Sequence, residues 1–249
     1  IKALQDQGLE VYADIVFNHL IGADEKETAP AVKYSWDNRN KPISDEEEIE
    51  AWTKFTFPGR KGKYNDYVWT WKNFSGVDYD DRTNDHALFN FAQKGWEDQV
   101  DDEMGNYDYL MGCDLDMENP ETIEQLDKWG KWYQELTNVD GYRLDAVKHI
   151  EFNYYVNWLL NRREEKGKDL FVVGEYWSGD LPKLEEYLDS SGNLIHLFDV
   201  PLHYNFYEAS HSNGAYDMSQ IFAGTLTASR EDYAVTFVDN HDTQVGQSL

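Results

Sequence analysis

Short, continuous apolar runs recur along this chain, and four of them end in an acidic residue. The segments 11–19, 141–149, 171–177 and 235–242 contain these runs together with the residues that follow them. In each segment an Asp or Glu lies close to His, Arg, Lys or Trp. A strand buried on both faces of a sheet has such a continuous apolar pattern. An acid at the end of a buried strand is costly unless it acts in a site or has a partner. The pattern therefore predicts one site assembled from the ends of several parallel strands.

Segments with helical periodicity alternate with these runs. Strands are predicted at 11–17, 141–147, 170–176, 195–201 and 234–239. Helices are predicted at 1–8, 121–137, 151–166, 181–189 and 216–228. Alternation of strand and helix is typical of a parallel sheet with right-handed crossovers, so the predicted fold class is α/β.

Residues 20–120 lose this alternation and contain the densest aromatic, Asp and Asn content of the chain. A loop of that length with no structure of its own is improbable in a folded domain. We therefore predict an inserted, small, β-rich subdomain. Its acidic run, Asp45 to Glu48, is interpreted as the solvated start of a helix.

Composition narrows the class of partner. The chain has 249 residues, 41% of them hydrophobic, so a sizeable core is expected and disorder is not. The formal net charge of −26 argues against binding to nucleic acids or anionic membranes, because phosphate contacts need Lys and Arg. No apolar run is long enough to cross a bilayer. We expect neither a nucleic-acid nor a membrane partner.

The first residue is Ile1 and not Met, so we expect an internal piece of a longer protein. The absence of a signal peptide is then uninformative. The single Cys113 excludes an internal disulfide and fits either a cytoplasmic or a secreted protein. A cytoplasmic location is our expectation, and secretion is the alternative.

Three acids at strand ends, Asp145, Glu175 and Asp242, fit the chemistry of glycoside hydrolysis. That reaction uses a carboxylate nucleophile and a carboxylic acid that protonates the leaving oxygen, held in different environments. Arg143 lies two residues before Asp145, so both side chains point the same way and the guanidinium can keep this nucleophile ionised. Glu175 has no cation nearby in the sequence and is followed by two aromatic residues, a setting that raises a carboxyl pKa and suits an acid/base. For Asp14, inside a predicted strand, we expect a buried salt bridge or hydrogen bonds near Arg143.

These segments resemble, in order and spacing, the four signature regions of the α-amylase family of retaining glycoside hydrolases. They stand here as Asp14–His19, Gly141–His149, Gly174–Trp177 and Val238–Asp242. Each alone is weakly specific, but the set is highly specific, and the resemblance covers the whole chain. Other stretches are similar to the bacterial liquefying α-amylase branch, namely Phe57–Arg60, Gly105–Met111 and Phe198–His203. Asp101–Gly105 is most similar to the cytoplasmic members of that branch.

The resemblance implies a (β/α)8 TIM barrel with a small β-rich subdomain inserted after the third strand. This chain would be a partial barrel that holds strands three to seven. Residues 1–19 and 120–249 would form the catalytic barrel domain, and residues 20–119 the inserted calcium-binding domain. Asp145 would be the nucleophile, Glu175 the acid/base, and Asp242 the third carboxylate, which binds sugar hydroxyls. The implied substrate-binding residues are Arg143, His19, His241, Lys148 and Trp177.

The resemblance also implies one structural Ca²⁺ that joins the inserted domain to the barrel. The matching positions are Asn18, Asp108, Asp114 and the backbone carbonyl of His149, which offer the hard oxygen ligands that Ca²⁺ prefers. Without the resemblance, Asp108 and Asp114 could equally be ordinary turn residues. Secreted relatives carry further metal ions, and the sequence departs from them at two such positions, Ser75 and Glu97.

The predicted function is endo-acting hydrolysis of α-1,4-glucosidic bonds in starch, glycogen and maltooligosaccharides by a monomer. The signature regions leave open a same-family enzyme that releases oligosaccharides or transfers glucosyl units, because product length depends on cleft loops. A non-catalytic carbohydrate-binding homologue would lack one of the three acids, and all three are present. A metal-dependent barrel hydrolase would end a strand in His-x-His, and no run here does. This piece of the protein would be inactive alone if it is incomplete.

Overall fold

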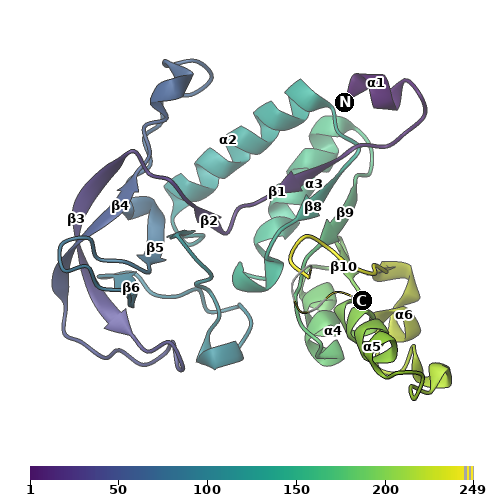
Figure 1. The fold of residues 1–249 in the computed structure, drawn as a ribbon. Coiled ribbons are helices and arrows are strands. Elements are labelled where there is room, and N and C mark those ends of the chain that lie inside the picture. The colour runs from purple at the N-terminus through teal and green to yellow at the C-terminus, as the bar shows by residue number, and fades with distance from the viewer. Residues whose placement is uncertain (244–245, 247, 249) are drawn as a thin grey trace. The chain divides into compact units, whose positions relative to one another are not determined.

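Within the residues that this computed structural model describes (1–243, 246 and 248), five strands form one parallel sheet (Figure 1). They are β1 (Tyr12–Ile15), β8 (Gly141–Leu144), β9 (Phe171–Gly174), β10 (His196–Phe198) and β11 (Ala234–Val235). Each strand pairs in parallel with the next, so the order in space follows the order in the chain. The predicted parallel sheet and the order of its five strands are confirmed, but each strand is shorter than predicted, and the one predicted at 234–239 ends at Val235. The described strands leave the sheet open, with β1 and β11 at its edges.

The apolar runs form the core of this sheet because each of four adjacent strands supplies a buried aliphatic side chain. Ile15, Leu144, Val172 and Leu197 are all buried. At the start of β8 the backbones lie so close that a side chain would not fit. A Cβ atom on Gly141 would meet the Phe171 carbonyl oxygen at 2.2 Å.

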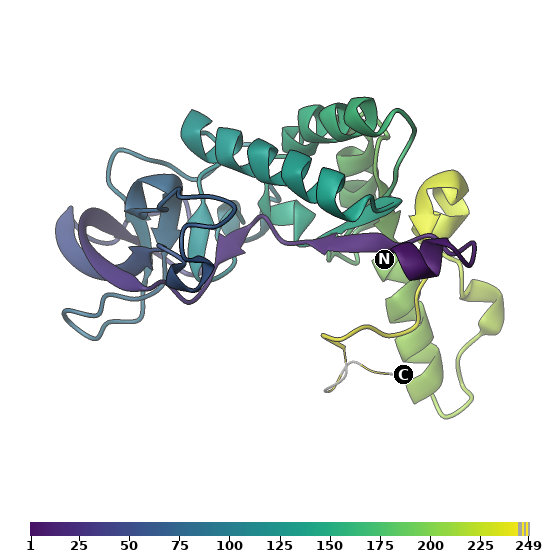
Figure 2. The same ribbon diagram turned by 90° about the horizontal axis from the view of Figure 1, so that it is seen from above.

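Helices occupy the connections between these strands, as crossovers of a parallel sheet do (Figure 2). The α-helices are α1 (Lys2–Gln5), α2 (Pro120–Thr137), α3 (Tyr154–Lys166), α4 (Leu181–Ser190), α5 (Val200–His211) and α6 (Leu226–Ser229). Short 3-10 turns are η1 (Pro58–Arg60), η2 (Trp71–Asn73), η3 (Glu103–Gly105), η4 (Val147–His149), η5 (Met218–Gln220) and η6 (Glu231–Tyr233). No helix in the described part of the chain is long and apolar enough to cross a membrane.

Two predicted elements after residue 195 have the wrong extent. The strand predicted at 195–201 ends at Phe198, because Asp199 caps a helix there by accepting a hydrogen bond from the Leu202 N–H at 3.1 Å. Helix α5 therefore begins at Val200, where the apolar pattern indicated a strand. The helix predicted at 216–228 is broken into η5 and α6, with Gly224 between them at φ 68°. A left-handed residue ends a helix.

Residues 19–115 contain an antiparallel sheet of six strands, which confirms the β-rich character predicted for this region. Its strands are β2 (His19–Leu20), β3 (Glu25–Tyr34), β4 (Glu47–Lys54), β5 (Phe74–Val77), β6 (Leu88–Phe91) and β7 (Cys113–Leu115), in the order β2-β7-β5-β6-β3-β4. The helix start predicted at Asp45–Glu48 is wrong, because Glu47 begins β4. Burial alternates along this strand, with Glu47, Ile49 and Ala51 less exposed than their neighbours. Strand β4 pairs with β3 along its length.

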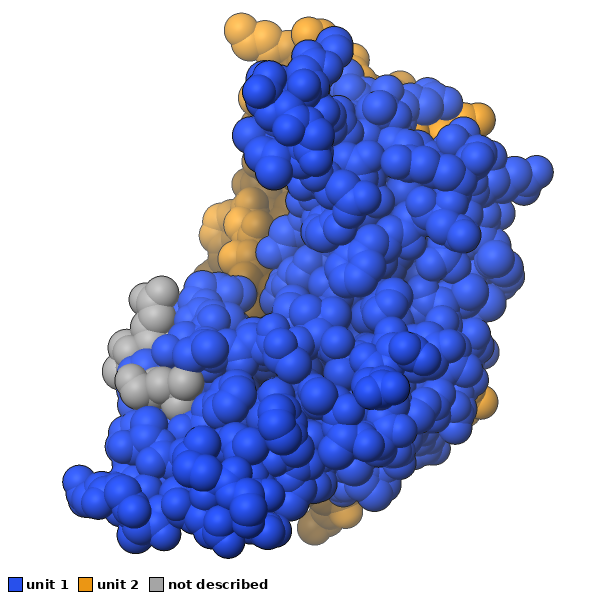
Figure 3. Space-filling view, turned by 90° about the vertical axis from the view of Figure 1, so that its right-hand side faces the viewer, with its two compact units in different colours: residues 1–15, 133–148, 152–249 blue, residues 16–132, 149–151 orange. Residues whose placement is uncertain are grey.

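The chain divides into two compact units, coloured in Figure 3. Unit 1 contains residues 1–15, 133–148 and 152–249, and unit 2 contains residues 16–132 and 149–151. Unit 1 holds the parallel sheet, and unit 2 holds the antiparallel sheet. The division into barrel and inserted domain at residues 19 and 120 stays a prediction.

Candidate active site

Three neighbouring strands of unit 1 bring Asp14 and two of the predicted catalytic acids, Asp145 and Glu175, together at their carboxyl ends. Asp14 on β1 stands opposite Arg143 on β8 in the sheet register, and Arg143 stands opposite Val173 on β9. Asp145 and Glu175 each directly follow the last residue of a strand. Their N–H groups donate to carbonyls of the neighbouring strand, at 2.9 Å and 2.8 Å. Because residues two apart along a strand face the same side, Arg143 and Asp145 point the same way.

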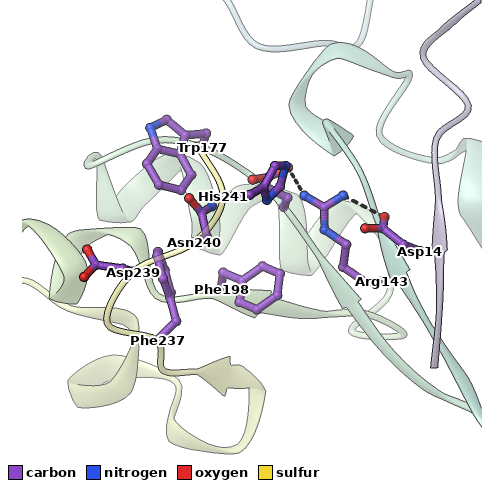
Figure 4. Close-up of a pocket in the computed structure, with 9 residues that line it drawn as sticks. Asp14, Arg143, Trp177, Phe198, Phe237, Asp239, Asn240 and His241 are labelled. Carbon is purple, nitrogen blue, oxygen red and sulfur yellow. Dashed lines mark hydrogen bonds and ion pairs between the residues drawn. The ribbon is translucent and has the colours of Figure 1, made fainter. Parts of the chain in front are cut away.

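The guanidinium of Arg143 contacts three carboxyl groups. Nη1 donates to Asp14 Oδ1 at 2.7 Å and to Asp145 Oδ1 at 2.5 Å. Nη2 donates to Glu175 Oε2. The contact with Asp145 is the one that the sequence spacing predicted. Figure 4 shows Arg143 and Asp14 pointing toward each other, with the pairing drawn between them.

The structure adds to one expectation about this cluster and corrects another. Glu175, which has no cation near it in the sequence, has one beside it in the fold, since Arg143 binds its carboxyl group. That partner could not be seen in the sequence because the two residues are 32 positions apart. The salt bridge of Asp14 with Arg143 is not buried, because 61% of the Asp14 side chain is exposed.

Burial and charge act in opposite directions on the acid/base candidate. Burial raises the pKa of the Glu175 carboxyl, the positive charge of Arg143 lowers it, and the neighbouring Asp145 raises it again. The charge of Asp242 also raises it, and the resulting pKa lies above the ordinary value for glutamate. Burial alone would lower the pKa of Arg143, but its hydrogen bond to Asp14 and the charges of Glu175 and Asp145 raise it. The cluster therefore combines a permanent cation with a carboxyl group that keeps its proton to a higher pH than usual.

A pocket of about 240 Å³ opens beside this cluster (Figure 4). It is lined by Asp14, Arg143, Glu175, Trp177, Phe198, Phe237, Asp239, Asn240 and His241. Aromatic walls with a few polar groups are typical of sites for small ligands. The sequence interpretation missed Phe198 and Phe237, whose positions at the ends of β10 and β11 could have indicated them. It also missed Asp239 and Asn240, although both lie inside a signature segment.

The chain turns sharply after Asp145 and is tied to the segment around Glu175. Ala146 has a φ of 51°, a left-handed conformation that residues other than glycine seldom adopt. The Val147 N–H then donates to the Glu175 carbonyl at 3.1 Å. Buried Lys148 donates through Nζ to the Trp177 carbonyl at 3.1 Å. These bonds fix the two strand ends that carry the acids with respect to each other.

The turn that carries Asp242 is held together by its own hydrogen bonds. Asn240 Oδ1 accepts from the N–H groups of Asp242 and Thr243, both at 3.0 Å. The Asn240 N–H donates to Thr243 Oγ1 at 2.9 Å. His241 lines the pocket, and its Nε2 lies 3.4 Å from the Asp242 carboxylate. Asp242 itself is exposed on this turn, outside the residues that line the pocket.

Comparisons with known proteins show the family of this chain. The family model "Alpha amylase, catalytic domain" matches residues 1–248. This chain belongs to the α-amylase catalytic-domain family. Three similar curated relatives are an α-amylase of Geobacillus stearothermophilus (49% identity), a glucan 1,4-α-maltohexaosidase of Bacillus sp. strain 707 (44%) and a cytoplasmic α-amylase of Escherichia coli K12 (43%). Each alignment covers all of this chain and 46%, 49% and 51% of the respective relative. The chain thus spans about half the length of these relatives.

The four positions predicted to hold Ca²⁺ all lie in unit 2. Asn18 Nδ2 donates to Asp114 Oδ1 at 3.2 Å. Asp108 Oδ2 accepts from the Glu97 N–H at 3.1 Å. His149 Nδ1 lies 2.6 Å from the carbonyl oxygen of Tyr107, the residue before Asp108.

The chemistry of this set fits a hard cation. Asn18 Oδ1 is buried and has no hydrogen-bond partner among the described residues. Burial, and then the charge of Asp114, raises the pKa of the Asp108 carboxyl well above its usual range. Burial also raises the pKa of the Asp114 carboxyl well above its usual range, with Glu97 adding to the effect. Oxygen donors crowded in a buried place are stabilised by a divalent cation such as Ca²⁺. Among the described residues no cluster of three or more His, Cys, Asp or Glu side chains is placed to hold a metal, and the matched set contains only two carboxylates.

The two positions that depart from the family's extra metal sites have partners within the protein. The Ser75 hydroxyl donates to Asp114 Oδ2. The Glu97 carboxyl oxygens accept from the N–H groups of Met117 at 2.8 Å and Glu151 at 2.7 Å. Hydrogen bonds therefore occupy the carboxyl oxygens of Glu97.

His19 is the predicted substrate residue that lies in unit 2. It begins β2 opposite Asp114, and its Nδ1 lies 3.5 Å from Asn18 Nδ2. Its role toward a sugar stays a prediction.

Proposed function

We propose that the protein containing this chain hydrolyses internal α-1,4-glucosidic bonds of starch, glycogen and maltooligosaccharides with retention of configuration. The observation that carries the proposal is the single guanidinium of Arg143 held between Asp145 and Glu175 at adjacent strand ends. A retaining glycosidase needs two carboxyl groups close together and in different protonation states. Membership of the α-amylase catalytic-domain family supports the assignment to α-glucans.

In this mechanism Asp145 is the nucleophile. The guanidinium cannot be deprotonated, so its contact with Oδ1 places a permanent positive charge beside the carboxylate and orients it. The carboxylate attacks the anomeric carbon, and the glycosidic bond breaks as Glu175 gives its proton to the leaving oxygen. The product of this step is a covalent glycosyl-enzyme and a shortened glucan.

Glu175 is the acid/base, and its geometry indicates which oxygen carries the proton. Oε2 accepts a hydrogen bond from Arg143, so the proton of the neutral acid belongs on Oε1. After proton transfer, the same guanidinium stabilises the Glu175 carboxylate. That carboxylate then takes a proton from the water that attacks the anomeric carbon, which releases Asp145 and restores the acid.

The remaining predicted residues bind sugar. Trp177 and His241 line the pocket and offer an aromatic face and a hydrogen-bonding imidazole. Asp242 acts as the third carboxylate on sugar hydroxyls. Lys148 and His19 are also proposed to bind sugar. One Ca²⁺ would be held by Asn18, Asp108, Asp114 and the carbonyl of His149. It would supply positive charge to buried carboxylates and have a structural role.

At the level of the fold, we infer that the parallel sheet is strands three to seven of a (β/α)8 barrel. Residues 1–19 and 120–249 then form the catalytic domain, and residues 20–119 form the insertion. The open edges at β1 and β11 fit a sheet that continues in the rest of the protein.

The test is product analysis with the full-length protein on soluble starch and on maltooligosaccharides of defined length. An endo-acting enzyme lowers the viscosity of starch faster than it releases reducing ends. A narrower activity is the second candidate, because a relative named a maltohexaosidase is about as similar as relatives named α-amylase. A product that is mainly one oligosaccharide from the first minutes would favour it.

A further inference from the structure

A buried histidine lies behind the pocket, in the segment Phe198–His203 that the proposed chemistry does not use. His203 is on α5 and is fully buried. Its ring stacks on Phe237, a pocket residue, with centroids 5.0 Å apart and planes 11° apart. It also lies 5.8 Å from the ring of Trp177.

The imidazole binds the chain directly before the turn that carries His241 and Asp242. His203 Nδ1 lies 2.6 Å from the carbonyl oxygen of Val238. A carbonyl oxygen only accepts, so Nδ1 carries the hydrogen and donates it. Nε2 is buried and has no hydrogen-bond partner among the described residues. An N–H at that atom would be buried without an acceptor, which is costly, so a ring with its hydrogen on Nδ1 fits this place.

The position of His203 is itself fixed by the start of its helix. Its N–H donates to the Asp199 carbonyl at 3.2 Å, and the Asp199 N–H donates to the Val235 carbonyl at 2.9 Å. The Asp199 carboxylate accepts from the N–H groups of Leu202 and Thr227, at 3.1 Å and 2.7 Å. Hydrogen bonds of Asp199 therefore join the end of β10 to the starts of α5 and α6. These bonds hold the helix turn from which His203 contacts Val238.

The turn that follows Val238 is already closed by the hydrogen bonds of Asn240 and Thr243. Because it holds its own shape, its placement depends on how its ends are attached. We propose that His203 is a positioning residue for the catalytic site. It anchors Val238 so that the turn presents His241 to the pocket and keeps Asp242 within electrostatic reach of Glu175. This inference rests on the proposed function and adds to it a residue outside the pocket.

Variants of the full-length protein separate positioning from general stability. His203→Phe keeps a ring to stack on Phe237 and removes the donor, and His203→Asn keeps an N–H donor near the place of Nδ1. His196→Phe is the matched control, because His196 Nδ1 also binds a strand carbonyl, that of Val172 at 3.0 Å, away from the catalytic turn. A small misplacement of catalytic groups costs up to about 100-fold, so we expect His203→Phe to lower kcat on starch roughly tenfold or more. His203→Asn should recover most of that loss, and His196→Phe should leave kcat within roughly twofold.

A double-mutant cycle tests whether His203 acts through the turn. Measured with an activated glycosyl fluoride, His203→Phe should cost less than about twofold in an Asp242→Asn background, because residues that act as a unit are not additive. Equal losses in both backgrounds would overturn the proposal and assign His203 a separate structural role.

Amide hydrogen exchange gives a measurement that does not depend on activity. Residues 238–243 should exchange faster in His203→Phe than in the unchanged protein and in His196→Phe. Unchanged exchange there overturns the inference, even if kcat falls. If the unchanged protein does not hydrolyse α-1,4-glucans, the proposed function fails, while exchange still decides whether His203 anchors the turn.

Discussion

At the scale of single residues, the proposed chemistry depends on one guanidinium that serves two carboxyl groups with different tasks. Arg143 can do this because it lies on β8, between β1 and β9, two residues before Asp145. It is also paired with Val173, which lies two residues before Glu175. The same cation contacts the Asp145 carboxyl group and limits how far burial raises the pKa of Glu175. The two roles are thus distinguished by burial and not by access to a cation.

Substitution of either acid should stop hydrolysis, but at different steps. Asp145→Asn removes the nucleophile, so no covalent intermediate forms from any substrate. Glu175→Gln removes the proton donor, yet a glycosyl fluoride needs no proton, so the enzyme should still be glycosylated and then stall. Intact-protein mass spectrometry with the fluoride distinguishes the two. An adduct on Asp145→Asn and none on Glu175→Gln would reverse the roles.

The pH dependence of activity should follow Glu175 on the alkaline side. The acid must be protonated to work, and its raised pKa keeps it so at higher pH than an exposed glutamate, with activity lost as pH rises through that pKa. Arg143→Gln removes the charge that lowers this pKa. The alkaline limb of kcat/KM should therefore move to higher pH while kcat falls by roughly 100-fold from lost orientation.

The control for this profile is Arg230→Gln, which removes a guanidinium that pairs with Asp189. Its pH profile should match that of the unchanged protein. An alkaline limb that moves to lower pH in Arg143→Gln would contradict the assignment of Glu175 as the acid.

The sequence predicted part of this cluster and missed the rest for a physical reason. The contact of Arg143 with Asp145 follows from strand periodicity, which is local. The contact with Glu175 depends on the register of β8 and β9, which a single sequence does not state. Asp14 was expected near Arg143, but its exposure depends on which side chains cover the edge strand β1.

At the scale of elements, continuous apolar runs were sufficient to predict the strands of the parallel sheet. Helix α5 was missed because its first residues are apolar and its start is decided by Asp199, whose partners lie in α6 and β11. Strand β4 was missed because its acidic start was taken for a helix start. Acidic side chains on an edge strand can extend into water, so they are compatible with a strand. The alternation that indicates the strand is seen only in the residues that follow them.

The Asp199 carboxylate should therefore be a stability determinant of this edge of the sheet. Asp199→Ala removes the cap of α5 together with the hydrogen bonds to Thr227. We expect a loss of at least about 2 kcal/mol in the free energy of unfolding, measured by urea denaturation of the full-length protein. Asp217→Ala, which removes the exposed cap of η5, is the control and should have a smaller effect. Equal effects of the two substitutions would show that the buried hydrogen bonds of Asp199 add nothing to the free energy of unfolding beyond the effect of an exposed helix cap.

At the scale of the whole molecule, the two units differ in what stabilises them. In unit 1 the buried carboxyl groups of Glu175 and Asp199 accept hydrogen bonds from Arg143 and from backbone N–H groups. Unit 2 buries Glu97, Asp108 and Asp114, and besides this burial their carboxyl groups raise one another's pKa. Sequence reasoning predicted a β-rich region there from composition, but not its strand order, which is set by long-range antiparallel pairing. The calcium assignment came from the family resemblance, because spacing alone does not distinguish Asp108 and Asp114 from turn residues.

Chelation should lower the melting temperature of the full-length protein, because a metal that binds only the folded state stabilises it by mass action, by about 2.7 kcal/mol at 100 times Kd. Asp108→Asn should abolish this difference. Without metal, the variant should be no less stable than the unchanged protein, since it removes a carboxylate whose charge is unfavourable when buried. Asp37→Asn changes an exposed carboxylate of the same unit and should keep the full response to chelator. A melting temperature that is indifferent to chelator would contradict the calcium assignment.

The central claim is that Asp145 and Glu175 form a retaining pair that acts on α-glucans. The most direct test is proton NMR of the first product that the full-length protein releases from a maltooligosaccharide, recorded before mutarotation. Retention through a covalent intermediate predicts the α-anomer, with carboxyl groups roughly 5–5.5 Å apart and not about 6.5–9.5 Å. Initial release of the β-anomer would contradict the nucleophilic role of Asp145 and the mechanism built on it.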